Sequence, residues 1–267
     1  MGDRTRPSRL RLQSGIARAG MTRISRFRPA RQAVGRLCDD ERVEMTGMKD
    51  RRFSMGVLDM TDAARFLDIP RSTFHRWAQG YDRGGPLLHV TPAPAGQAQV
   101  PFIAVAEAHV LKALRAAGVR PARIRPALDR LATEFGREYV LVSPNLSTDG
   151  IDVLWDFSRT EEGRDLMEGS TGQLVMREIV EDYLSYVTWA DDNLPARLTF
   201  PNCLPSKVVI DPYRAFGQPI FEGSRARVRD VAAMLKAGED PQVTADEHGV
   251  SIEDVRTAAR VLLGRAP

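Results

Sequence analysis

The sequence predicts a mainly α-helical protein with small β elements, an α+β fold. Three observations support this prediction: a helix-turn-helix spacing of apolar residues, two apolar stripes at helical steps, and three short helical patterns near the C-terminus. They divide the chain into a disordered basic extension (1–57), a winged helix-turn-helix domain (58–136), a mixed α/β connector or association region (137–204) and a small three-helix, helix-turn-helix-like domain (205–267).

The overall composition is that of a globular protein, with 43% hydrophobic and 27% charged residues. No apolar run reaches the length of about 18 residues that a membrane span requires. Cys38 and Cys203 are far apart and the four histidines are scattered, so neither a disulfide framework nor a metal site is expected. We therefore expect a cytoplasmic protein with no metal and no cofactor.

The first 47 residues differ from the rest in charge. They contain 11 arginines and five acidic residues, a net charge of +6 in a chain whose total is +3. Large apolar side chains are few and show no period, which indicates disorder. This segment could be a basic arm that adds phosphate contacts. In the alternative, translation begins at Met48 and the segment is not native.

Two short helices are expected from Leu58 onward, with Thr61 and Ser72 as candidate N-caps. The break between them is Asp68-Ile69-Pro70, and Gly80 ends the second helix. Helices that cross steeply need a small residue at their contact, an apolar residue in the turn and an apolar inner face. The residues that meet these needs are Ala64, Ile69, Phe74 and Trp77.

That inner face leaves a polar outer face on the second helix, near the end that would enter a DNA major groove. The predicted DNA-binding residues on this helix are Arg71, Ser72, Thr73, His75, Arg76 and Gln79. In the alternative, the helix pair is a packing unit whose polar face is merely solvated.

Two apolar runs, 87–90 and 100–103, follow and predict the strands of a wing. Gln97 and Gln99 in the intervening loop are expected to contact the DNA backbone or minor groove. Two helices come next, with apolar stripes over 106–117 and 121–135. This order of elements over 58–136 resembles a MerR-like winged helix domain, most clearly at Thr61–Trp77 and Val119–Ile124.

The middle of the chain gives mixed signals. Runs at 139–142 and 153–157 are interpreted as strands, and Gln173–Leu184 as a helix. A hairpin is expected where 186–189 and 197–200 flank Asp191-Asp192-Asn193. This region is either an association surface or a connector that packs on the first domain.

After a linker at 201–205, apolar runs at 208–212 and 216–221 lead into three short helices, the last with a capping box from Ser251 to Asp254. This block resembles the C-terminal domain of bacterial antitoxins once classed as a domain of unknown function. The resemblance is carried by Ile210-Asp211-Pro212, Phe216–Pro219, Ala237–Pro241, Glu247–Ser251 and Asp254-Val255. Together with the MerR-like half, the chain resembles a VapB-type antitoxin.

The resemblance implies neutralisation of a PIN-like RNase toxin, autoregulation of a two-gene operon through operator DNA, and homo-oligomers or hetero-oligomers with the toxin. The predicted partner-binding residues are Gly217, Gln218, Pro219, Arg225 and Arg227. In the alternative, the turn at 217–219 only shapes the fold and the arginines form a solvated basic edge.

No catalytic constellation is present. The paired acids, such as Glu181-Asp182, are adjacent on helices and point about 100° apart, so they do not converge on a metal. No phosphate loop, GxSxG or HExxH occurs. We expect no enzyme activity. Two other functions remain open beside the antitoxin: a stand-alone MerR-like transcription regulator, and a protein-assembly module that does not bind DNA.

Overall fold

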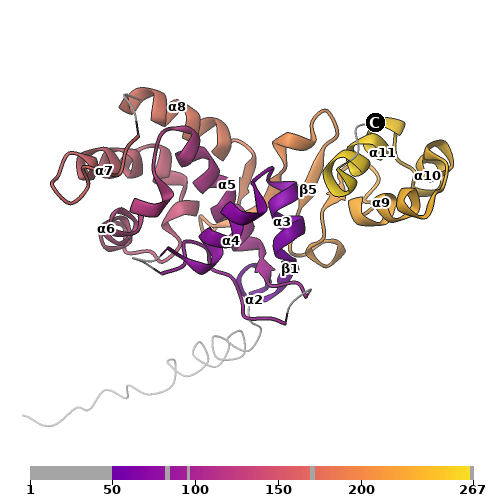
Figure 1. Ribbon diagram of the computed structural model, residues 1–267, viewed down its shortest axis with the longest axis horizontal. Helices are drawn as coiled ribbons and strands as arrows, with labels where there is room; N and C mark the ends of the chain where they lie inside the picture. The colour runs from indigo at the N-terminus through magenta and orange to yellow at the C-terminus, as the bar shows by residue number, and fades with distance from the viewer. Residues whose placement is uncertain (1–49, 82–84, 95–96, 169–171, 265–267) are drawn as a thin grey trace, which may run out of the picture. The chain divides into compact units, whose positions relative to one another are not determined.

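A computed structural model describes residues 50–81, 85–94, 97–168 and 172–264 (Figure 1). The basic segment 1–47 and the alternative start at Met48 lie outside these residues. Order begins earlier than Leu58, which corrects the predicted extension to residue 57. Helix α2 (Arg51–Ser54) and strand β1 (Gly56–Leu58) precede it, and Val57 is fully buried. Asp50 stabilises α2 because its carboxylate accepts the Arg52 backbone N–H.

The helix-turn-helix consists of α3 (Met60–Phe66) and α4 (Arg71–Gln79). All four residues of the predicted spacing are buried, with exposures of 6% or less: Ala64, Ile69, Phe74 and Trp77. The predicted caps were wrong. Asp59 caps α3 by accepting the Thr61 and Asp62 N–H groups, and α4 follows Pro70 without any side-chain cap. The negative charge of Asp59 also interacts favourably with the positive end of the helix dipole, an advantage that the predicted cap Thr61 lacks.

The predicted wing hairpin does not form as expected. Strand β2 (Val100–Pro101) pairs antiparallel with β1, and residues 87–90 are not a strand. The reason lies in Glu107, a buried carboxylate that accepts the His89 backbone N–H at 2.9 Å and contacts the ring Nδ1 at 2.6 Å. Because the His89 N–H donates to this carboxylate, it cannot donate to a neighbouring strand. The loop itself closes where the Thr91 N–H donates to the Gln99 carbonyl.

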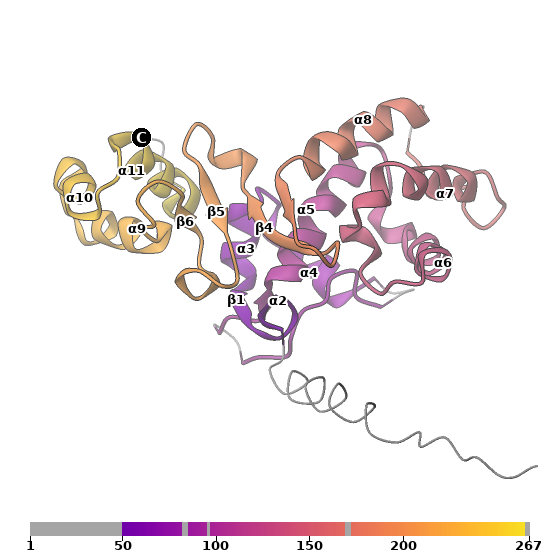
Figure 2. The ribbon, with the colours of Figure 1, turned by 180° about the vertical axis from the view of Figure 1, so that it is seen from behind.

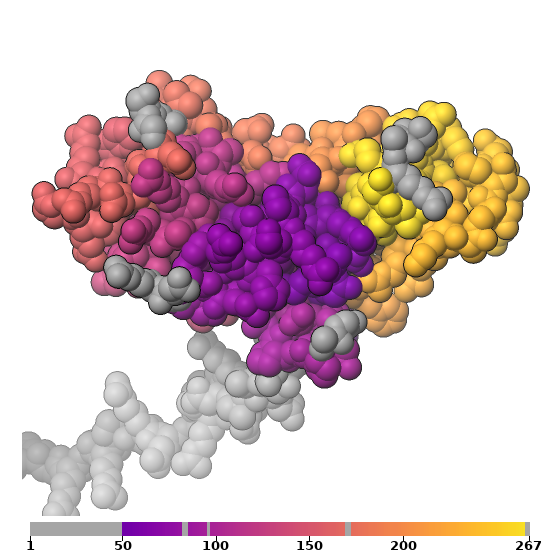
Figure 3. Space-filling model, viewed as in Figure 1, coloured from indigo at the N-terminus to yellow at the C-terminus, as the bar shows by residue number. Residues whose placement is uncertain are grey.

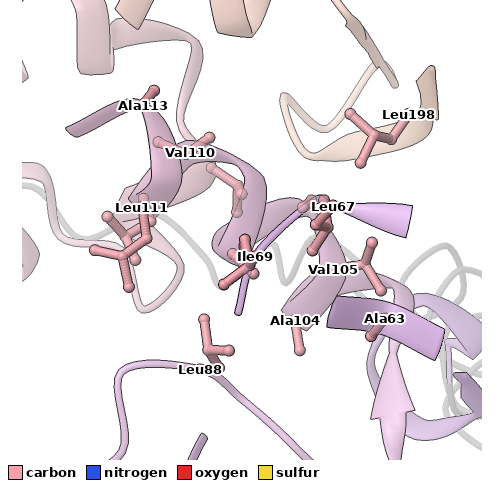
Figure 4. Close-up of a cluster of buried hydrophobic side chains, with 14 of the residues drawn as sticks. Ala63, Leu67, Ile69, Leu88, Ala104, Val105, Val110, Leu111, Ala113 and Leu198 are labelled. Atoms are coloured by element: carbon pink, nitrogen blue, oxygen red, sulfur yellow. The ribbon is translucent and has the colours of Figure 1, made fainter. Parts of the chain in front are cut away.

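Helix α5 (Phe102–Ala116) forms the centre of the core, with almost every side chain buried. Figure 4 shows its Val105 beside Leu67 of the helix-turn-helix, and Val110 and Leu111 farther along the helix in the same cluster of buried side chains. The turn η2 (Pro121–Arg123) and α6 (Arg125–Phe135) follow. The two predicted apolar stripes therefore lie on helices that face the core.

The middle segment contains more helix than predicted. The run at 139–142 forms the 3-10 turn η3 (Val140–Val142), and 153–157 lies within helix α7 (Asp149–Ser158), so both predicted strands were wrong. Ile151, Leu154 and Phe157 are buried at steps of three along α7. A short apolar run fits a buried helix as well as a strand. A further turn, η4 (Pro144–Ser147), precedes α7, and α8 (Gln173–Leu184) matches its prediction.

Four short strands form an antiparallel sheet in chain order: β3 (Val187–Trp189), β4 (Pro195–Thr199), β5 (Val208–Ile210) and β6 (Ile220–Phe221). The first two are the predicted hairpin. The turns between the later strands are η5 (Pro201–Cys203) and η6 (Ala215–Gly217). The sheet therefore crosses the boundary predicted at residues 204–205. Pairing of β4 with β5 makes the expected linker part of the fold.

The last three helices are α9 (Val228–Ala237), α10 (Pro241–His248) and α11 (Ile252–Ala258), and the predicted capping box of Ser251 and Asp254 is present. A π-helical turn, η7 (Ala259–Leu263), continues α11. The four-stranded sheet lies between these helices and helices α5 to α8 (Figures 1 and 2). The predicted α+β fold class is confirmed. Within the described residues, no helix has both the length and the apolarity to cross a bilayer.

Candidate nucleic-acid interface

Helix α4 presents a polar face over a buried apolar one. Phe74, Trp77 and Ala78 lie in the core, and their burial turns the remaining side chains outward. The outward residues line an open groove of about 830 Å³: Arg71, Ser72, His75, Arg76, Gln79, Gly80 and Tyr81. The guanidinium carbon of Arg76 lies 6.0 Å from the centre of the Tyr81 ring. This cation–π contact helps to hold the Arg76 side chain beside α4.

A second groove joins α4 to the loop after residue 91. It is lined by Asp59, Met60, Thr61, Arg71, His75, Gln79 and Gln99. The structure thus brings Gln99 to the predicted α4 residues. Gln97 is exposed but lines neither groove, and Thr73 is half-buried. The prediction for Gln99 depended on a wing hairpin that is absent. Gln99 nevertheless lies beside α4, because it directly precedes β2 and β2 pairs with β1.

A third groove, of about 710 Å³, contains residues that the sequence did not indicate. It is lined by Thr61, Ala64, Arg65, Asp68, Ile69, Pro70, Arg71, Asn202, Arg260 and Val261. Arg71 lines all three grooves, so they form one continuous surface around the start of α4. The exposed Arg260 comes from η7, and its Nη1 donates to the Asn202 carbonyl at 2.8 Å. We call these grooves together the α4 surface.

Two contacts hold the C-terminal helices against α3. Arg229 Nη2 lies 2.7 Å from Asp62 Oδ2, and Val261 and Leu262 of the π-helical turn are largely buried near α3. A π-helical turn changes which side chains share a helix face. Arg260 is exposed at the groove, and its neighbour Val261 also lines the groove but is largely buried. Figure 3 shows the indigo residues of α3 and α4 beside the yellow C-terminal residues.

The turn predicted to bind a partner makes contacts within the protein. Gly217 has φ +72°, and a Cβ there would lie 2.3 Å from Val57 Cγ1. The Gln218 Nε2 donates to the Val57 carbonyl, and Pro219 is buried. These contacts support the structural interpretation of the three residues, and their contact with a partner stays a prediction. Arg225 is exposed, and Arg227 Nε donates to Asp230 Oδ2 at 2.6 Å.

The titratable side chains Cys203 and His89 have pKa shifts with structural causes. In the part of the chain that the structure describes, no three His, Cys, Asp or Glu side chains gather as metal ligands. Burial raises the pKa of Cys203 to about 12, so this cysteine is a protonated thiol at neutral pH. The hydrogen bond to Glu107 raises the pKa of His89, which fits its role in fixing the loop to α5.

Two family models match this chain, one over the helix-turn-helix region and one over the C-terminal helices. Residues 57–128 match the family described as "Putative DNA-binding HTH domain", and residues 208–260 match "Protein of unknown function (DUF433)". A relative from Mycobacterium tuberculosis, named "Putative antitoxin VapB45", is 42% identical over 225 residues. The match covers 78% of this chain and 94% of the relative. The chain belongs to the VapB45 antitoxin family.

Two further matches to this VapB45 family member come from the same organism. "Uncharacterized protein Rv2308" is 28% identical over 81% of this chain and 92% of its own length. The crystal structure of Rv2018 matches with a TM-score of 0.62 and 40% identity, over 78% of this chain and 99% of that chain. The resemblance to VapB-type antitoxins is confirmed, and these relationships point to a DNA-binding regulator rather than an enzyme.

Proposed function

We propose that this VapB45 family member is the antitoxin of a type II toxin-antitoxin module. It binds and neutralises a PIN-like RNase toxin in the cytoplasm and represses its own operon by binding operator DNA, as a homo-oligomer or a hetero-oligomer with the toxin. The α4 surface is the observation that supports DNA binding. The antitoxin name of the 42% identical relative supports the toxin partner.

The proposed docking places α4 in the major groove. Arg76, His75 and Gln79 are exposed on the outward face, and arginine and glutamine pair with guanine and adenine edges there. The first turn of α4 has no side-chain cap after Pro70, so its free N–H groups and Arg71 suit a phosphate. Absence of the predicted Ser72 cap is therefore consistent with DNA contact.

Replacing Arg76 by alanine tests the recognition helix. We expect operator affinity to fall about 5- to 150-fold, because one base contact contributes about 1–3 kcal/mol. The probe is a fluorescent duplex of the region immediately upstream of this gene, titrated at fixed salt. Arg256→Ala is the control, since Arg256 is exposed, paired with Glu253 and lines none of the three grooves. Equal affinity of Arg76→Ala and wild type would overturn the assignment.

Arg260→Ala tests the contribution of the C-terminal helices. We expect weaker binding of the upstream duplex and of a random duplex alike, because a phosphate contact carries no sequence information. The salt dependence should also decrease by about one released counterion. Arg256→Ala removes the same charge from the same end of the chain. If both variants keep the wild-type salt slope, Arg260 makes no phosphate contact.

Growth assays test the toxin partner. The open reading frame adjacent to this gene is induced in a host with and without residues 48–267 of this chain. Growth arrest that this chain relieves supports the antitoxin function. A harmless neighbour, with DNA binding retained, would favour the stand-alone regulator. Absence of DNA binding in the wild type would instead favour the assembly module.

A further inference from the structure

The loop between β5 and β6 holds two aromatic side chains in solvent. Phe216 is 81% exposed and Tyr213 is 59% exposed. A single exposed apolar side chain is ordinary on a protein surface, so exposure alone indicates nothing. The backbone and the anchors of this loop supply the further evidence.

The backbone at Phe216 is in an unfavourable conformation. Ala215, Phe216 and Gly217 have φ of +45°, +56° and +72°, three left-handed residues in succession. L-residues rarely adopt this region, and only Gly217 does so without steric conflict. A strained backbone conformation persists only where surrounding contacts hold it in place, and such conformations are common at functional sites.

Contacts on both sides of Phe216 impose this conformation. On one side, Gly217 packs against the buried Val57 and Gln218 donates to the Val57 carbonyl. On the other, the Tyr213 hydroxyl donates to Asp50 Oδ1 at 2.9 Å and its backbone N–H donates to Asp211 Oδ1 at 2.8 Å. The loop is therefore fixed before any partner binds, which lowers the entropy cost of association.

Two arginines line a hollow next to Phe216 in the chain. Arg214 and Arg225 line a hollow of about 270 Å³ with Ala215 and Ile220. Among the described residues, the Arg225 side chain makes no ion pair, and Arg214 Nε lies 3.5 Å from Asp211 Oδ2. Phenylalanine and arginine are both enriched in protein–protein interfaces, and binding hot spots are often aromatic residues or arginine.

We propose that Phe216, which follows Ala215 at the edge of the hollow that Arg214 and Arg225 line, is the apolar anchor of a docking site for a folded protein whose apolar pocket is edged by carboxylates. The inference rests on the proposed function only in requiring a protein partner. The charge of the two arginines selects an acidic rim. DNA is the less suitable occupant, because the cationic groups that would neutralise phosphates gather on the α4 surface instead.

The test measures binding of the full chain to the purified product of the adjacent open reading frame. Phe216→Ala keeps the left-handed strain and removes the ring, and it should weaken binding at least about 30-fold, as at a hot spot. Arg225→Ala should weaken it less and make binding less salt-dependent. Leu174→Ala is the matched control, since Leu174 is 68% exposed on α8. Phe216→Gly should raise the melting temperature while weakening binding, because it relieves the strain.

Each other result has a definite meaning. Wild-type binding that Phe216→Ala leaves unchanged would overturn this inference alone. A wild-type chain that does not bind the product would overturn both the inference and the toxin-binding part of the proposed function. If Phe216→Ala instead leaves partner binding intact and abolishes self-association in light scattering, Phe216 contacts a second copy of the chain. If the variant loses DNA binding at matched salt instead, Phe216 contacts DNA. Either result would overturn the inference.

Discussion

Phe74→Ala is expected to lower the free energy of unfolding by about 3–5 kcal/mol, the usual range for phenylalanine removed from a well-packed core. Phe74 is fully buried on the inner face of α4, where it joins Trp77 and Ile69. The cavity would loosen the contact that orients α4 on α3. We therefore expect DNA binding to be lost together with stability, and denaturant titration with a DNA-binding assay measures both.

The neighbouring residue provides the control for this prediction. His75 is exposed and lines the grooves on the outward face of α4. His75→Ala should change stability by about 0.5 kcal/mol at most, as surface substitutions do, while weakening DNA binding. If Phe74→Ala leaves the unfolding midpoint unchanged, or if His75→Ala unfolds the protein, the inner and outer faces of α4 are wrongly assigned.

Gly217→Ala should also destabilise the protein strongly, by about 2–6 kcal/mol. Two effects add: about 1–3 kcal/mol for a left-handed alanine and about 1–3 kcal/mol for overpacking a filled site. The added Cβ would lie 2.3 Å from Cγ1 of Val57, which is fully buried and has no room to retreat. Thermal unfolding measures the effect.

Gly223 offers a matched comparison in the same stretch of chain. A Cβ at Gly223 would meet nothing within 4 Å, and its φ is not in the left-handed region. Gly223→Ala should therefore be neutral or slightly stabilising, because alanine has less freedom in the unfolded chain. Equal melting temperatures for the two variants would show that the contact between Gly217 and Val57 does not form.

The sequence by itself determined those elements whose signals are local. The spacing of Ala64, Ile69, Phe74 and Trp77 was enough to predict the helix-turn-helix. The burial of the three helical residues follows from helical geometry, and Ile69 is the apolar residue that the turn needs. Helix α8 and the three C-terminal helices were predicted for the same reason, from apolar periods and from glycine, proline and cap residues. The polar face of α4 was predicted as well, because it consists of the residues that the buried apolar positions of this helix leave exposed.

Only the tertiary structure decided which distant segments meet. Strand β2 pairs with β1 rather than with 87–90, because Glu107 takes the His89 N–H. Helix α7 replaced a predicted strand because the burial that distinguishes the two comes from its neighbours. Arg260 reaches the α4 surface, and the turn at Gly217 reaches Val57, only through packing of the C-terminal half on the first. Contacts between residues far apart in sequence leave no local pattern, which is the physical reason that sequence reasoning missed them.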